Sequence, residues 1–133
     1  MSLVYLDACI IIYVVEKHPT FSSRIEALID NLNDVDLCYT PLVRMECLVM
    51  PFRTKDLKLQ NLYEQFLDLQ KILSLSIEVF DEAAKLRADF PNVKTPDALH
   101  LAAAIHNDCD EFWTNDDRLH KIAPKLVKNI IEK

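Results

Sequence analysis

The stretch LVYLD, residues 3–7, is a short apolar run that ends in a carboxylate. Such a run predicts a buried β-strand over residues 3–6, with Asp7 at its carboxyl end. A second run of this kind, Phe112 to Thr114, is followed two residues later by Asp116. Ligands of open parallel sheets bind beyond the carboxyl ends of the strands, so both aspartates are candidates for one site.

The rest of the chain alternates between strand-like and helix-like patterns. We expect strands at 3–6, 37–40, 75–77, 111–114 and 126–130, and helices at 9–15, 25–32, 41–49, 59–73, 78–90, 96–106 and 117–122. Strands separated by helices predict parallel crossovers and a sheet covered on both faces. The predicted fold class is therefore α/β, a three-layer α/β/α sandwich with a central parallel sheet of about five strands. The size of the chain predicts one domain, residues 1–133.

Composition excludes several classes of protein. The chain has 21 acidic and 15 basic residues and a formal charge of −6, which argues against a broad basic surface that holds nucleic acid. A nuclease remains possible, because a bound cation reverses the local field of its acidic ligands. The chain contains no glycine, which excludes the glycine-rich phosphate loops of nucleotide-cofactor enzymes.

The four cysteines, Cys9, Cys38, Cys47 and Cys109, show no C-x-x-C spacing. We expect buried, reduced thiols and neither a zinc site nor a redox motif. The amino terminus has no positive region before its apolar stretch, and no stretch approaches the roughly 20 apolar residues of a membrane helix. We expect a cytoplasmic protein.

Two further carboxylates lie on predicted helices that open with threonine and proline. Glu46 follows Thr40-Pro41 and Asp97 follows Thr95-Pro96, an N-cap with proline at the first helical position. Taken alone, Asp7 can be a simple helix cap, and Asp97 can be a favourable charge at the helix dipole. Glu46 lies among apolar residues on a helix that we expect to be largely buried, where an unpaired charge is costly. Four carboxylates gathered with Asp7 and Asp116 need a cation, and Mg²⁺ or Mn²⁺ prefers such oxygen ligands.

Four segments together resemble the PIN-domain ribonucleases, and among them the VapC-type toxins of toxin-antitoxin pairs. They are YLD (5–7), TPLVRME (40–46), TPDALHLAAA (95–104) and TNDDRL (114–119). The resemblance implies a metal-dependent endoribonuclease with Asp7, Glu46, Asp97 and Asp116 as its acidic quartet. Ala8 and Cys9 stand where the family often has a serine, threonine or asparagine, and Asp117 is an alternative to Asp116.

Within this reading we assign Asp7 and Asp97 as direct metal ligands, Glu46 as a ligand or a base, and Asp116 to a second metal or an outer role. The metal would polarise the phosphoryl oxygen and acidify a bound water. Thr114 is either a water or phosphate contact or an ordinary strand-end hydroxyl. Arg87 and Lys94 are candidate RNA contacts. His100 is expected to be structural rather than a ligand, and Trp113 to lie in the core.

Two other functions remain open. A phosphoryl-transfer or receiver-like domain would use Asp7 as acceptor, but Cys9 stands where dehalogenase-like phosphatases have a second aspartate. A non-catalytic RNA-binding or protein-binding PIN module is the other.

The partners that the resemblance implies are RNA and a small antitoxin whose tail inserts a basic side chain among the acids. A homodimer through the amphipathic segment 59–73 is also expected.

Overall fold

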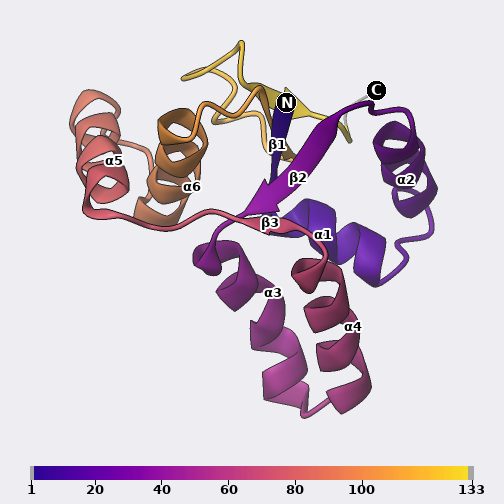
Figure 1. Ribbon diagram of the computed structural model, residues 1–133. Coiled ribbons are helices and arrows are strands. Elements are labelled where there is room, and N and C mark those ends of the chain that lie inside the picture. Colours follow the sequence, from indigo (N-terminus) through magenta and orange to yellow (C-terminus); the bar gives the residue numbers. More distant parts are fainter. Residues whose placement is uncertain (1, 132–133) are drawn as a thin grey trace.

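A five-stranded parallel sheet forms the centre of the computed structural model, which describes residues 2–131 (Figure 1). Its strand order is β3-β2-β1-β4-β5, with β1 (Ser2–Leu6) in the middle. The strands β2 (Val35–Tyr39) and β4 (Glu111–Thr114) pair with β1 in parallel. The edges are β3 (Lys71–Ile72) and β5 (Val127–Asn129). The predicted parallel α/β sheet of about five strands is confirmed.

Six helices surround the sheet. They are α1 (Ala8–Val15), α2 (Ser22–Asp30), α3 (Pro41–Thr54), α4 (Leu57–Asp68), α5 (Ile77–Asp89) and α6 (Thr95–His106). Figure 1 shows α5 and α6 on one side of the sheet, α1 and α2 on the other, and α3 and α4 extending beyond it as a pair. None of the helices within residues 2–131 combines the length and the apolar character that crossing a membrane requires.

One part of the core lies between the central strands and α6, and another includes buried residues of α1 and α3 such as Ile11 and Val43. Tyr5 and Phe112, which are neighbours in register on β1 and β4, stack with ring centroids 5.0 Å apart. Helix α6 is buried from Ala98 to Ala104, because its alanines allow the helix to approach the sheet closely. Trp113 is 3% exposed, so its predicted place in the core is confirmed. These contacts fix the carboxyl ends of β1 and β4 beside the start of α6.

Three local predictions are wrong. The strand expected at 75–77 lies at Lys71–Ile72 instead, and Ser76 caps α5 by accepting a hydrogen bond from Val79 N. The segment 59–73 is not one helix, since α4 ends at Asp68 and β3 follows. Residues 117–122 form turns rather than a helix, because Asp116 holds the backbone N–H of Arg118 in a local side-chain turn.

The two threonine-proline pairs also differ from expectation. Thr40 occupies the N-cap of α3, but its hydroxyl bonds to the Tyr5 hydroxyl instead of capping the helix. Thr95 is already helical, and Lys94 takes the N-cap position of α6. All four cysteines are free, as expected, but Cys9 is only half-buried. The two helices therefore begin where predicted without the predicted caps.

Candidate metal centre

Asp7 lies between β1 and α1 and makes three hydrogen bonds: its carboxylate accepts two and its backbone N–H donates one. Its Oδ1 accepts from Ala8 N at 2.8 Å and its Oδ2 accepts from Thr114 Oγ1 at 2.8 Å. Its backbone N–H donates to the Trp113 carbonyl at 3.0 Å. Burial raises the pKa of Asp7, while His100 and the hydrogen bonds of Thr114 and Ala8 lower it. Asp7 is thus the cap of α1 and also a carboxylate whose charge a cation would stabilise.

Glu46 is paired with His100, which the sequence did not reveal. His100 Nε2 lies 2.7 Å from Glu46 Oε1, and His100 Nδ1 lies 2.7 Å from the Tyr5 hydroxyl. The expectation that Glu46 is buried is wrong, because its side chain is one-third exposed (33%) and Met45 beside it is 57% exposed. Helix α3 presents this part of its surface outward. The counter-group of Glu46 is therefore a buried imidazole.

A chain of hydrogen bonds sets the orientation of that imidazole. The Tyr5 hydroxyl lies 2.9 Å from Thr40 Oγ1, and burial raises the pKa of Tyr5, which keeps its proton. The hydrogen-bonded chain therefore runs from Thr40 through Tyr5 and His100 to Glu46. Both ring nitrogens of His100 are engaged in these contacts, so the imidazole positions Glu46.

Asp7, Glu46 and His100 form one compact group. One ligand atom from each residue lies within 4.8 Å of the other two. Of the four predicted carboxylates, this group brings Asp7 and Glu46 together from the end of β1 and from α3. The arrangement gathers oxygen donors of the kind that Mg²⁺ and Mn²⁺ prefer.

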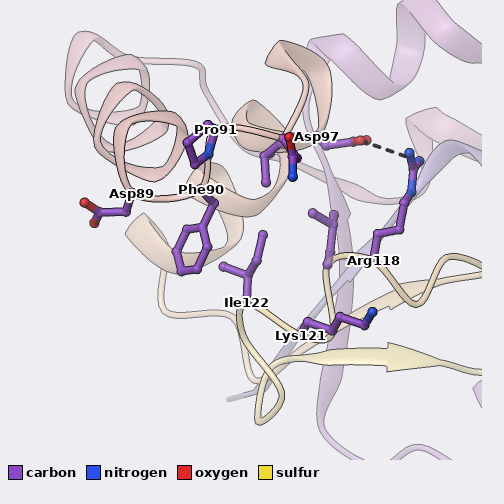
Figure 2. Close-up of a pocket in the computed structure, with 10 residues that line it drawn as sticks. Asp89, Phe90, Pro91, Asp97, Arg118, Lys121 and Ile122 are labelled. Carbon is purple, nitrogen blue, oxygen red and sulfur yellow. Dashed lines mark ion pairs between the residues drawn. The ribbon is translucent and has the colours of Figure 1, made fainter.

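Asp97 and Asp116 converge instead on Arg118, a residue that was not singled out from the sequence. Arg118 Nη2 lies 2.5 Å from Asp116 Oδ2 and 3.8 Å from Asp97 Oδ2, and Figure 2 shows the pair with Asp97. The Arg118 guanidinium lowers the pKa of Asp116 through these bonds. The only sequence signal was its place in TNDDRL, two residues after Asp116. Part of the negative charge of the site is therefore already balanced from within the chain.

Thr114 joins the two halves of the site. It is fully buried at the end of β4, donates to Asp7 Oδ2, and accepts from the backbone N–H of Asp116 at 3.2 Å. The hydroxyl therefore holds the Asp7 carboxylate directly and the Asp116 backbone through its N–H. Within residues 2–131, the hydroxyl is hydrogen-bonded to protein groups, and its contact with a water or a phosphate stays a prediction.

The remaining predicted residues lie around this centre. Asp117 Oδ1 accepts from Asn129 Nδ2 at 2.9 Å, which directs it toward β5. Arg87 donates to the Val93 carbonyl and to Thr95 Oγ1, so it ties together the connection between α5 and α6. Lys94 is exposed at the start of α6, next in sequence to this connection. Arg87 and Asp117 thus make defined contacts within the fold, and Lys94 is exposed.

Comparison with solved structures shows several similar folds. VapBC2 from Rickettsia felis, bound to a DNA fragment from its promoter, has 20% identity and a TM-score of 0.78 over 96% of this chain and 98% of that one. A toxin-antitoxin complex from Klebsiella pneumoniae has 19% identity and a TM-score of 0.79 over 100% of both chains. VapC20 from Mycobacterium tuberculosis, a sarcin-ricin loop cleaving toxin, has 10% identity and a TM-score of 0.73 over 90% and 95%.

At these identities the likeness to solved structures describes the fold alone. None of the curated proteins gives a significant match. The model of the PIN domain family matches residues 4–125, which includes all four carboxylates and both helices that carry Glu46 and Asp97. The chain belongs to the PIN domain family.

Proposed function

We propose that this PIN domain, taken as one functional unit over residues 1–133, is a metal-dependent endoribonuclease and the toxin of a toxin-antitoxin pair. The observation that carries the proposal is the gathering of Asp7 and Glu46 beside His100 at the carboxyl edge of the sheet. Asp97 and Asp116 meet nearby on Arg118. The likeness to a sarcin-ricin loop cleaving toxin supports the reaction class.

Asp7 and Glu46 are the first candidates to hold Mg²⁺ or Mn²⁺, with Asp97 and Asp116 completing the set. When bound, the metal would polarise a phosphoryl oxygen and lower the pKa of a water. Thr114 keeps Asp7 Oδ2 in place, and His100 keeps Glu46 Oε1 in place. We assign Glu46 as the group that accepts the proton of the attacking water, while the water oxygen bonds to phosphorus and the bond to the leaving ribose oxygen breaks.

The alternative in which Asp7 becomes phosphorylated is less favoured by the sequence, because Cys9 stands where dehalogenase-like phosphatases have a second aspartate. A non-catalytic binding module remains the second alternative, and it is separated from the first proposal by an assay of cleavage.

For partners, we propose an RNA substrate, a small antitoxin and a second copy of the chain. Solved complexes of toxins with antitoxins have the same fold as this chain, which supports the antitoxin. The surface of α3 and α4 supports an interface, since large apolar side chains there are exposed: Met45, Val49, Met50, Phe52, Leu57 and Leu62. An antitoxin arginine would compete for the carboxylates that Arg118 now contacts.

Cleavage of a labelled single-stranded RNA by the purified protein tests the proposal. We expect cleavage with Mg²⁺ or Mn²⁺, none with EDTA, and loss of cleavage in Asp7→Asn and Asp97→Asn with folding retained by circular dichroism. Asp117→Asn is the matched control, because its carboxylate is directed toward Asn129. Undiminished cleavage by Asp7→Asn at saturating metal would refute the assignment, and metal binding without cleavage would favour the binding module.

A further inference from the structure

A cavity of about 420 Å³ opens beside Asp97, between the α5–α6 connection and the turns after Asp116. Phe90 and Pro91 form one side of it, Leu119 and Ile122 line it with apolar surface, and Arg118 borders it next to Asp97. Figure 2 shows the Phe90 ring facing Ile122 across this space, whereas the Asp89 carboxylate points away from it. The cavity therefore shares a wall with the acidic site.

The cavity combines three features that a nucleotide requires. Phe90 offers an aromatic ring that is 40% exposed, on which a base can stack. Lys121 and Arg118 provide positive charge in a chain of net charge −6. Lys121 makes no ion pair with any residue in the described range 2–131. The volume lies at the low end of the range for small-ligand pockets, which suits one nucleotide rather than a helix of a partner protein.

The wall that carries Phe90 is held in place before any ligand binds. Phe90 N donates to the Leu86 carbonyl at 2.8 Å, and Val93 N donates to the Phe90 carbonyl at 3.0 Å. Arg87 donates through Nε to the Val93 carbonyl at 3.1 Å and through Nη1 to Thr95 Oγ1 at 3.0 Å. Arg87, which the sequence suggested as an RNA contact, thus acts as a positioning residue for this connection. A preformed wall binds without the loss of loop entropy.

We infer that this cavity is a base-binding subsite for single-stranded RNA. The base of a nucleotide next to the scissile phosphate stacks on Phe90, and Lys121 contacts the neighbouring phosphate. The inference rests on the proposed ribonuclease function, because it places the reacting phosphate at the carboxylates that border the cavity. It assigns a substrate contact to a part of the chain outside the acidic quartet.

Binding measured without cleavage tests the subsite. The test measures fluorescence anisotropy of a labelled RNA of about ten nucleotides with the Asp7→Asn protein. The measurement is repeated with RNAs that carry one abasic ribose at each position in turn. Phe90→Ala and Phe90→Leu should weaken binding about 5- to 100-fold, and Phe90→Tyr should retain it. Phe80→Ala is the matched control, because Phe80 lies on α5, whose C-cap is Phe90, and is 50% exposed.

The abasic probes identify the contact. At one position, loss of the base should weaken binding to the parent protein by the factor that Phe90→Ala causes, and it should cause no further loss in Phe90→Ala. Lys121→Ala should reduce the slope of log affinity against log salt by about 1, whereas Lys125→Ala should leave it unchanged. Equal affinity of Phe90→Ala and the parent for every probe overturns the inference.

The outcomes separate the subsite from the proposed reaction. If the protein with its native Asp7 cleaves RNA with metal but binding does not depend on Phe90, the subsite is wrong and the nuclease stands. If the protein cleaves nothing but shows base-dependent binding through Phe90, the subsite stands and the reaction is wrong. If Phe90→Ala alters only self-association or binding of a protein partner, the cavity is a protein-protein contact and the inference is overturned.

Discussion

Replacement of Thr114 by valine tests how the acidic site is held together. Valine has nearly the shape of threonine, so the buried end of β4 stays filled while one hydroxyl is removed. The substitution leaves Asp7 Oδ2 without its 2.8 Å donor and the Asp116 N–H without its 3.2 Å acceptor. The substitution therefore affects both halves of the site through a single atom.

The expected loss of stability follows from these two bonds. A hydrogen bond to a charged group contributes about 1.5 to 3 kcal/mol, and the half-buried carboxylate recovers part of it from water, which leaves about 1 to 3 kcal/mol. For a chain of 133 residues, each kcal/mol corresponds to about 3 to 4 °C in Tm. We therefore expect Thr114→Val to lower the Tm of the metal-free protein by about 3 to 12 °C at pH 8.

The effect has a defined pH dependence. Burial holds the pKa of Asp7 above its usual range, and the Thr114 hydroxyl is one of the groups that lower it. Without the hydroxyl the pKa rises further, so the variant disfavours ionised Asp7 more than the parent does. The difference in stability should be small at a pH where Asp7 is protonated and should grow as the pH rises through its pKa. In the pH profile of metal-dependent cleavage, the fall in activity on the acidic side (the acidic limb) should lie at higher pH for Thr114→Val than for the parent.

Thermal unfolding and RNA cleavage between about pH 4 and pH 9 measure both effects. Thr114→Ser is the matched control, because it keeps the hydroxyl and loses only the methyl group. We expect the serine variant to keep the acidic limb of the parent. The role given to Thr114 would be refuted by two results together. The acidic limb of the cleavage profile would coincide in the valine and serine variants, and the stability loss of the valine variant would be independent of pH.

Three further predictions concern the metal and the partners. Asp7→Asn should raise the Tm of the metal-free protein at neutral pH, because burial disfavours the ionised carboxylate; a lower Tm contradicts this. Mn²⁺ at 100 times its Kd should stabilise the parent by about 2.7 kcal/mol, reversibly with EDTA, and a similar gain in Asp7→Asn would exclude Asp7 as a ligand. Light scattering should show a homodimer that Met45→Glu with Leu62→Glu dissociates, and a parent that is monomeric at high concentration rejects the interface.

A further prediction concerns the proposed antitoxin. Its affinity should fall with rising salt, and a tail whose arginine is replaced by glutamine should still bind but inhibit cleavage poorly. Copurification followed by an RNA-cleavage assay measures this. A complex that cleaves RNA as fast as the free protein would exclude the competition between the tail and the metal.

The central strands of this protein and two of its candidate carboxylates were predictable from the residues alone. Apolar runs at 3–6 and 111–114 predicted the two central strands, because hydrophobic periodicity follows from burial and not from the details of packing. The rule that parallel strands present their carboxyl ends at one edge then placed Asp7 and Asp116 as candidates. The predicted bounds of elements were wrong where a single polar side chain sets the local backbone. Ser76 caps α5, and Asp116 holds the turn after β4.

The partners of the polar side chains in the site are known from the folded chain and not from the sequence. Glu46 meets His100 across 54 residues, and Thr114 meets Asp7 across 107 residues, and no local pattern encodes such pairs. Arg118 lies between Asp97 and Asp116 because the turns after β4 fold back toward the start of α6, where the Phe90 cavity also forms. Periodicity fixes which face of an element is buried, whereas the partners of polar side chains depend on distances set by packing in three dimensions.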